Sequence, residues 1–240
     1  MAELPLRTSD PLDAWLSTPL GQTLLASERA ALALALEDVF GQHLLQVGYW
    51  GPPDAFLPLA RLPGRSLIVD PSHRGDCVCH AGALGIASRS VDAVLLPHTL
   101  EFEPEPREVL REVERVLTAD GHLLIVGFAP LGAWGLRHWL SSGGFPPGLR
   151  QLWSPRRLRD WLRLLGFQIV STRHCVRTLP LERCQGGVVA EGLARLGQRL
   201  GDRFGAVYVL KARKRVCTLT PIRLRRGWRR SVAGNAVEIT

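Results

Sequence analysis

Residues 90–128 read SVDAVLLPHTLEFEPEPREVLREVERVLTADGHLLIVGF, and this stretch decides the fold. The run VDAVLLP (91–97) is continuously apolar and closed by proline, as expected of a strand buried on both faces. PREVLREVERVL (106–117) has apolar residues every three or four positions and predicts an amphipathic helix stopped by Gly121. HLLIVGF (122–128) is again a buried strand. A strand, a helix and a second strand in this order indicate a parallel sheet covered by helices.

The chain on either side of this stretch supplies further strands. HLLQVG (43–48) and SLIVD (66–70) predict two of them, and GDCVCH (75–80) predicts a short third one. FQIVSTRHCV (167–176) and AVYVLKARKRV (206–216) predict the last two. The sequence is therefore that of an α/β domain with a largely parallel sheet.

Helices are predicted before and after the central strands. Asp10 and Pro11 supply a cap and a first-turn proline for one helix, and an apolar stripe through residues 24–40 predicts a second. Ser154 and Pro155 cap a later one. We accordingly divide the chain into an N-terminal helical extension (1–40), an α/β domain (41–214) with a Gly-, Pro- and Trp-rich loop (129–153) and an insertion (178–204), and a basic tail (215–240).

Length and composition limit the classes of function. With 240 residues, 46% of them apolar, the chain can bury one substantial core. Its apolar runs stay well short of the roughly 20 residues that a membrane span needs, and its start lacks a secretory signal, so we expect a cytoplasmic protein. Five cysteines fit a reduced compartment. Cys77, Cys79 and His80 lie close together without a second ligand cluster at zinc spacing, so we predict no metal site.

The formal charge of +8 is concentrated near the C-terminus. From Lys211 to Arg230 the chain contains KARKRV and RLRRGWRR, and the next acid is Glu238. A basic tail with an interspersed aromatic residue suits phosphate-rich partners such as nucleic acid. The alternative is a solvated tail that only keeps the protein soluble.

Residues 90–128 also resemble the methyltransferase type 11 group of the class I S-adenosylmethionine-dependent methyltransferases. In that group the corresponding strand, helix and strand contain S-F-D-x-V, L-E-H and L-R-E-x-x-R-V-L-x-P-G-G. The resemblance covers about residues 40–128. It implies a doubly wound, mostly parallel seven-stranded sheet whose last strand is antiparallel, with S-adenosylmethionine as cofactor. The residues that match at the same spacing are Ser90, Val91, Asp92, Leu100, Glu101, Leu110, Arg111, Glu112, Arg115, Val116, Leu117 and Gly121.

The resemblance places a cofactor loop at LLQVGYWG (44–51), where the group commonly has L-D-x-G-C-G-x-G. Gly48 keeps the first glycine, whose missing side chain lets the backbone approach a ligand. Gln46 replaces an acid that helps to set the loop and the cofactor's amino group, and Trp50 stands at the middle glycine. The resemblance thus implies that Gly48, Tyr49, Trp50 and Gly51 border the cofactor.

Trp50 leaves two alternatives for the site. Its ring either forms one wall of a reshaped cofactor pocket or fills the pocket. We expect the wall, because Asp70 would otherwise be an acid kept without its ligand. We also expect the turn to lead into a helix that begins at residues 52–54.

Further cofactor contacts are implied on the neighbouring strands. Asp70 ends the second strand, where a carboxylate accepts the two ribose hydroxyls; alternatively it only forms a turn or a helix cap. Pro71, Leu84 and Pro97 are the other residues implied at the cofactor. No acid occurs at 80–82, where the group often contacts adenine, so backbone groups would have to serve there.

The chemistry of methyl transfer needs few catalytic groups, because much of the rate can come from positioning the acceptor. His98 follows the fourth strand and could act as a base near neutral pH; alternatively it only packs or hydrogen-bonds at the strand end. The loop at 129–153 contains Trp134, Trp139 and Trp153, which either stack on the acceptor or pack in the core. In the same loop, Arg137 and His138 would favour an anionic acceptor if they point inward.

Three functions remain open at this point. The leading one is methyl transfer from S-adenosylmethionine to an unidentified small-molecule or macromolecular acceptor. The second is a catalytically inactive methyltransferase fold that serves as a scaffold or binding module. The third is association with nucleic acid through the basic tail, with binding that weakens steeply as salt is raised. The sequence predicts no oligomeric state.

Overall fold

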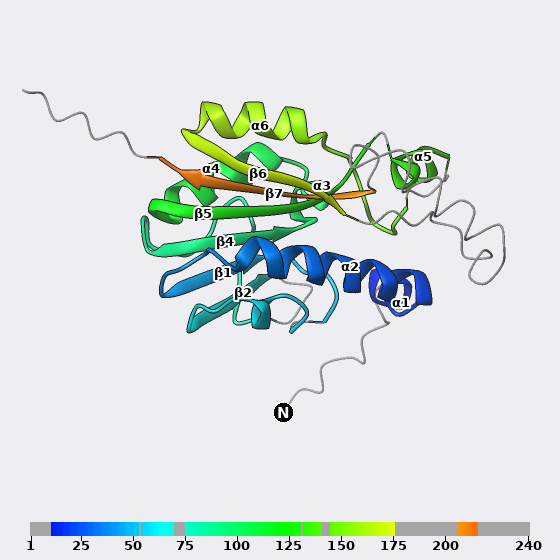
Figure 1. Cartoon of the computed structure of the whole chain (residues 1–240), viewed down its shortest axis with the longest axis horizontal. Coiled ribbons are helices and arrows are strands. Elements are labelled where there is room, and N and C mark those ends of the chain that lie inside the picture. The colour runs from blue at the N-terminus through cyan, green and yellow to red at the C-terminus, as the bar shows by residue number, and fades with distance from the viewer. Residues whose placement is uncertain are drawn as a thin grey trace, which may run out of the picture.

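One seven-stranded sheet organises the molecule (Figure 1). The computed structural model describes residues 11–52, 54–69, 75–130, 132–140, 145–175 and 206–215. The strand order is β3-β2-β1-β4-β5-β7-β6; neighbours pair in parallel from β3 to β5, and β7 is antiparallel to both β5 and β6. Because β1 lies between β2 and β4, the predicted fold is confirmed. The strands are β1 (His43–Val47), β2 (Gly64–Val69), β3 (Cys77–Val78), β4 (Val91–Pro97), β5 (Leu117–Phe128), β6 (Phe167–Cys175) and β7 (Val207–Lys214).

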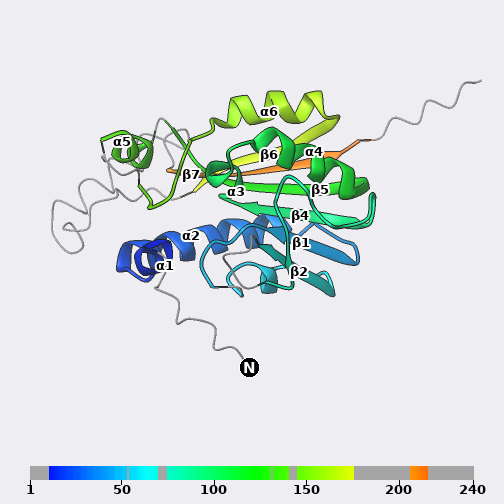
Figure 2. The same ribbon diagram turned by 180° about the vertical axis from the view of Figure 1, so that it is seen from behind.

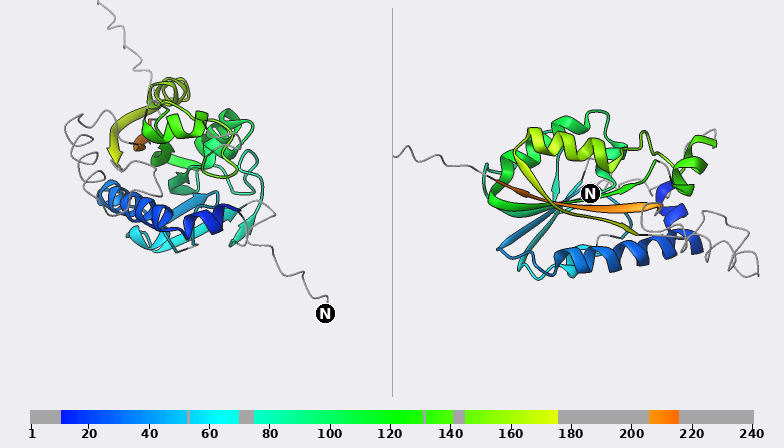
Figure 3. Two further views of the ribbon diagram at one scale, coloured as in Figure 1. Left: turned by 90° about the vertical axis from the view of Figure 1, so that its right-hand side faces the viewer. Right: turned by 45° about the horizontal axis from the view of Figure 1, so that its top comes forward.

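Helices cover both faces of the sheet. In the right-hand view of Figure 3, α2 (Pro19–Leu36) lies on one face and α6 (Pro155–Leu164) on the other. Seen from behind, α4 (Pro106–Val116) lies on the same face as α6, beside β5 (Figure 2). Alternating side chains of each central strand enter the two cores, which pack against these layers. The short elements are α1 (Pro11–Leu16), η1 (Leu57–Leu59), α3 (Thr99–Phe102) and α5 (Ala133–Leu140).

Helix α2 of the N-terminal helical extension is capped at its start and held to the sheet at its end. Thr18 caps its start, because the Thr18 side chain accepts a hydrogen bond from the amide of Gly21. At its other end, the Lys211 ammonium of β7 donates to the Ala35 carbonyl and pairs with Asp38. Lys211 is buried, as is Lys214 of the same strand. Both lysines therefore belong to the sheet, although the sequence places Lys211 at the start of a basic run.

The connection from β1 to β2 differs from the prediction. No α-helix begins at residues 52–54; the described part of this connection has turns and the single 3-10 turn η1. Prolines at positions 58 and 63 explain the difference, because each lacks the amide that a continuing helix would use. The face of the sheet at β1 is therefore covered by α2 and not by a helix that follows the glycine turn.

The end of α4 also differs from the prediction. The helix stops at Val116 rather than near Gly121, and β5 begins at Leu117 with a bridge to Val91. The register then shifts until Ala93 pairs with His122. Asp120 takes a left-handed conformation (φ +67°) in this irregular stretch, which a helix could not continue through. The predicted strand at 122–128 is thus the regular part of a longer one.

Some predictions fall outside the described residues. These are the helical insertion at 178–204 and the tail at 216–240. Among the residues that are described, no helix is long and apolar enough to cross a membrane.

The two sides of α2 give a matched test of the core. Leu32 is fully buried against the sheet, whereas Leu34 is 52% exposed on the same helix. We expect Leu32→Ala to lower the free energy of unfolding by about 2–5 kcal/mol, because it removes apolar contacts and leaves a cavity. Leu34→Ala should change it by less than about 0.5 kcal/mol. Urea unfolding of the two variants measures the difference; equal losses would contradict the position of α2.

Candidate functional site

Gly48 begins the turn at the carboxyl end of β1. Its φ is +95°, and a Cβ there would lie 2.5 Å from Oγ1 of Thr99. The Thr99 hydroxyl in turn donates to the carbonyl of Val47. The Gly48 amide donates to the Ile68 carbonyl at 2.9 Å, which continues the pairing of β1 with β2. A glycine is therefore required here by the backbone conformation and by the close approach of α3.

Gln46, two residues earlier, has a buried and incompletely bonded side chain. It is 2% exposed, and its Nε2 donates to the Gly48 carbonyl at 3.3 Å. Its Oε1 has no hydrogen-bond partner in the described structure. A buried oxygen without a donor is costly, so this atom is where a ligand with an N–H group would be stabilised. Gln46 was not among the residues predicted at the cofactor, because in the sequence it stands where an acid is expected.

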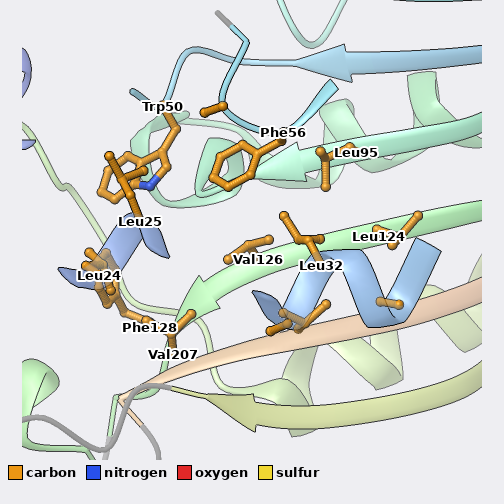
Figure 4. Close-up of a cluster of buried hydrophobic side chains, with 14 of the residues drawn as sticks. Leu24, Leu25, Leu32, Trp50, Phe56, Leu95, Leu124, Val126, Phe128 and Val207 are labelled. Atoms are coloured by element: carbon orange, nitrogen blue, oxygen red, sulfur yellow. The ribbon is translucent and has the colours of Figure 1, made fainter. Parts of the chain in front are cut away.

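Trp50 points into the core beneath α2. Figure 4 shows its ring beside Leu24 and Leu25 of that helix. The residue is 1% exposed, and its indole N–H donates to Oε2 of Glu28 at 2.9 Å. Its ring centroid lies 4.1 Å from that of His98 and 5.9 Å from that of Phe128. This packing agrees with the second alternative for Trp50, a ring that fills space, more closely than with a wall exposed to a cavity.

His98 lies at the centre of the same cluster and is fully buried. Its Nε2 is 2.9 Å from Oε1 of Glu28 and its Nδ1 is 2.7 Å from Oε2 of Glu101. The other Glu101 oxygen accepts from the Phe128 amide at 2.7 Å. His98 thus joins α2, the end of β4, α3 and the end of β5. Its left-handed backbone (φ +57°) turns the chain directly from β4 into α3.

The electrostatics of the cluster favour a protonated imidazole. Burial alone would lower the pKa of His98, but the charge of Glu28 and the hydrogen bonds to Glu101 and Glu28 outweigh it and raise that pKa to about 9. Burial raises the pKa of Glu101, although its bonds to His98 and to the Phe128 amide oppose this. At neutral pH His98 is therefore a cation that donates both of its N–H groups to carboxylates.

This geometry bears on the catalytic role expected of His98. A general base needs an unprotonated nitrogen within reach of the substrate. Both ring nitrogens of His98 face carboxylates, and the residue is closed to solvent. The arrangement supports the alternative in which His98 packs and hydrogen-bonds at the strand end. Glu28 was not anticipated, although it interrupts the apolar stripe of α2 at a core position and so signals a buried carboxylate that needs a partner.

The other described residues implied at the cofactor have the following contacts. The Tyr49 hydroxyl donates to Asp13 of α1 at 2.9 Å, and Gly51 (φ +74°) approaches Leu25 of α2. Leu84 is buried, and its amide donates to Glu112. Pro97 is buried at the end of β4. Asp70 and Pro71 lie outside the described residues.

The loop expected to contact the acceptor contains α5, and its tryptophans have different environments. Trp134 is buried and stacks on Phe128 with centroids 5.6 Å apart, whereas Trp139 is 73% exposed. Trp153 is buried and donates to the Leu100 carbonyl. The guanidinium of Arg137 lies 3.7 Å from the centroid of the Phe145 ring. Trp134 and Trp153 therefore pack in the core, the alternative left open by the sequence.

Two cavities of the described surface lie away from the Trp50 cluster. One, of about 330 Å³, lies between η1 and β2 and includes Arg65 and Asp76 in its lining. The other, of about 500 Å³, includes Asp92 and His122. His122 begins the regular part of β5, so this cavity lies at the opposite end of that strand from Phe128. Neither lining includes Trp50 or His98.

Comparisons with known proteins agree with this architecture. A family model described as a methyltransferase domain matches residues 59–125. A solved S-adenosylmethionine-dependent methyltransferase from Archaeoglobus fulgidus superposes with a TM-score of 0.57 at 16% identity, covering 78% of this chain and 93% of that one. The chain therefore has the fold of the class I methyltransferases. In α/β folds of this kind, ligands bind at the carboxyl ends of the parallel strands, the edge that carries Gly48 and His98.

Two further comparisons limit what the class I methyltransferase fold implies. An uncharacterized protein of Mycobacterium tuberculosis is 34% identical over 175 residues, but the match spans 70% of this chain and 61% of that protein. The crystal structure of the [4+2]-cyclase SpnF superposes with a TM-score of 0.53 at 20% identity, covering 82% of this chain and 81% of that one. One fold thus serves different reactions, so the reaction has to be argued from the site.

The raised pKa of His98 predicts how stability depends on pH. The pKa is about 9 in the folded protein and 6.5 for an ordinary histidine, so the folded state binds an extra proton between these values. This stabilisation is complete below about pH 6.5 and is lost as the pH rises through 9. We expect the free energy of unfolding to fall by on the order of a few kcal/mol across this window.

Urea unfolding at pH 6 and pH 9.5 tests this expectation in three proteins. His80 is exposed, so the control variant His80→Gln should lose as much stability as the parent when the pH rises from 6 to 9.5. His98→Gln should be less stable at pH 6 and should lose less on going to pH 9.5. A His98→Gln profile parallel to that of the parent would contradict the buried imidazolium.

Proposed function

We propose that the protein binds S-adenosylmethionine at the carboxyl ends of β1 and β4 and transfers its methyl group to an acceptor. The observation that carries this proposal is Oε1 of Gln46, a buried acceptor without a partner in the described structure. The Nε2 of the same amide donates to the Gly48 carbonyl, so the glutamine lies at the glycine turn. An unsatisfied buried acceptor costs about 1–3 kcal/mol, and an ammonium group such as that of the cofactor would satisfy it.

The other roles follow from the positions of the residues along this edge. Gly48 would shape the turn beside the cofactor, Asp70 would accept the ribose hydroxyls, and Pro71 would border the cofactor next to it. Leu84 would contribute an apolar surface only, because its amide is already bonded to Glu112. Pro97 would border the cofactor at the end of β4. When bound, the cofactor supplies an electrophilic methyl group on its sulfonium.

In this proposal His98 is a positioning residue rather than a base. Its two carboxylate partners fix the turn from β4 into α3 and, through the indole N–H of Trp50, the glycine turn as well. Alignment of the acceptor can supply much of the rate of a methyl transfer without proton removal. Such an arrangement suits an acceptor that is nucleophilic without a base.

A second candidate function rests on Trp50. Its buried ring packs beside the carboxyl ends of β4 and β5, on His98 and Phe128, the edge where an α/β protein normally binds its ligand. A methyltransferase fold closed in this way would act as a binding module. The two candidates differ in one measurable property, the affinity of the parent protein for the cofactor.

Gln46 can be tested by removing its oxygen without adding bulk. Isothermal titration should show that the parent binds S-adenosylmethionine and S-adenosylhomocysteine. Gln46→Leu should bind both about 10- to 100-fold more weakly, because a hydrogen bond to a charged group is lost. The variant should stay folded, since the change also removes a buried unsatisfied oxygen. Leu57→Ala, a change of a half-buried residue on η1, is the control and should bind like the parent. If the parent and Gln46→Leu bound the cofactor with equal affinity, Gln46 would not contact it.

Trp50 separates the enzyme from the binding module. If the parent binds the cofactor, its tryptophan fluorescence should change on titration, and Trp50→Phe should lose most of that change while keeping a ring in the core. Trp50→Gly empties the volume of the indole. A parent that gives no binding heat at millimolar cofactor, beside a Trp50→Gly variant that binds, would overturn methyl transfer in favour of the binding module.

A further inference from the structure

Helix α6 presents a row of arginines on the outside of the molecule. It lies over β6 and β7 on the opposite side of the sheet from α2 (Figure 3). Its sequence PRRLRDWLRL contains four arginines and one acid in ten residues. We call Arg156, Arg157, Arg159 and Arg163, together with Arg107 of α4, the α6 arginine face.

The arginines of α6 have little internal neutralisation. The one described ion pair on the helix joins Arg163 to Asp160 at 3.9 Å, with side chains 67% and 72% exposed. A pair this exposed contributes little. Arg156 and Arg157 are exposed, and Arg159 is half-buried. The face is therefore a local excess of positive charge, which a purely structural helix would not need.

Several of the guanidinium groups are held in place. Arg157 lies 4.8 Å from the centroid of the Trp153 ring and 5.2 Å from that of the Trp161 ring. Arg107 lies 4.9 Å from the centroid of Trp161, so this ring joins the two helices. The Arg159 Nε donates to the Pro155 carbonyl at 3.1 Å. Side chains that are already ordered lose less entropy when they bind a ligand.

The spacing of the row suits a regular series of anions. Arg156, Arg159 and Arg163 follow one another at three and four residues and so share one side of the helix. Along the axis they are separated by about 4.5 and 6 Å, at 1.5 Å per residue. Long arginine side chains at these intervals can reach successive phosphates of a nucleic acid strand.

The apolar side of the helix is not free to enter a lipid bilayer, although Leu164 at its last position is 86% exposed. Leu158 and Leu162, which form its apolar side, are fully buried against the sheet. An interfacial membrane helix needs that side free to insert. Trp161 is also unsuited to stacking on an unpaired base, because arginines already lie over its ring. A polyanion that is recognised through its backbone fits better than a membrane or a single strand.

We propose that the α6 arginine face binds the phosphate backbone of duplex nucleic acid, without reading its sequence. This surface is independent of the basic tail predicted to suit nucleic acid, which beyond Arg215 lies outside the described residues. It is also independent of the proposed cofactor site. The residues concerned have no part in the Gln46 or His98 clusters.

The test compares two triple variants of equal net charge. Arg156→Gln, Arg159→Gln and Arg163→Gln together remove three charges from the face. The control carries Arg61→Gln, Arg65→Gln and Arg89→Gln, three exposed arginines outside α6. The probes are fluorescent 20-base-pair duplexes of RNA and of DNA with arbitrary sequence, titrated in fluorescence anisotropy between 50 and 200 mM salt.

We expect the face variant to bind at least tenfold more weakly than the parent at 50 mM salt. Its slope of log affinity against log salt should be shallower by about 2–3, since each phosphate contact contributes about 0.9. The control should match the parent, and both proteins should keep the parent's unfolding profile and its affinity for S-adenosylmethionine. Preference for one of the two duplexes would identify the source of the phosphates.

Two outcomes would overturn the proposal. If both triple variants weaken binding equally, net charge or the C-terminal sequence is responsible and the α6 face is not a site. If the parent binds vesicles of phosphatidylserine and phosphatidylcholine but neither duplex, the partner is a membrane surface. The cofactor site is tested separately: Gln46→Leu should lose affinity for S-adenosylmethionine and still bind the duplexes like the parent.

Discussion

The buried imidazolium of His98 between Glu28 and Glu101 is the interaction on which the functional edge of the molecule depends. Removing three ionisable groups from water is expensive, and replacing such a cluster by apolar residues is often neutral or stabilising. Once buried, however, His98 is needed, because its loss would leave two carboxylates without the cation between them. The cluster therefore fixes geometry: it joins α2, the end of β4 and the end of β5, and through Trp50 it also fixes the glycine turn.

Much of the sheet could be predicted from the sequence, because strands buried on both faces appear as continuous apolar runs with helices between them. The connection after Gly51 and the end of α4 could not be predicted. In both places a helix was expected, and local turn-forming residues ended or replaced it. The pairing of Glu28 with His98 was also hidden, because 70 residues separate them and periodicity gives no partner for a buried acid. The position of Glu28 in an apolar stripe was the available signal, and it predicts a buried charge without saying which residue neutralises it.

The charge pattern near the C-terminus shows the same limit. A run of basic residues suggests a solvated tail, yet Lys211 and Lys214 are buried in β7. Their aliphatic stems pack in the sheet, while the ammonium groups reach the last turn of α2 and the end of α4. Lysines at helix C-termini are favoured by the carbonyl groups exposed there. Two residues of the basic run thus neutralise helix ends within the fold, whereas α6 carries a row of exposed arginines.

Gly48 and Gln46 carry different weight as evidence for a cofactor. A retained glycine at the end of β1 is explained entirely by its positive φ and by the approach of Thr99, and a protein without a cofactor would need it equally. The position of Gln46 differs, because its buried Oε1 has no donor in the described structure, and the fold gains nothing from leaving it so. A protein that had lost its ligand would be free to replace Gln46 by an apolar residue of similar volume. The glutamine thus points to a ligand more directly than the glycine does, even with the Trp50 ring buried nearby.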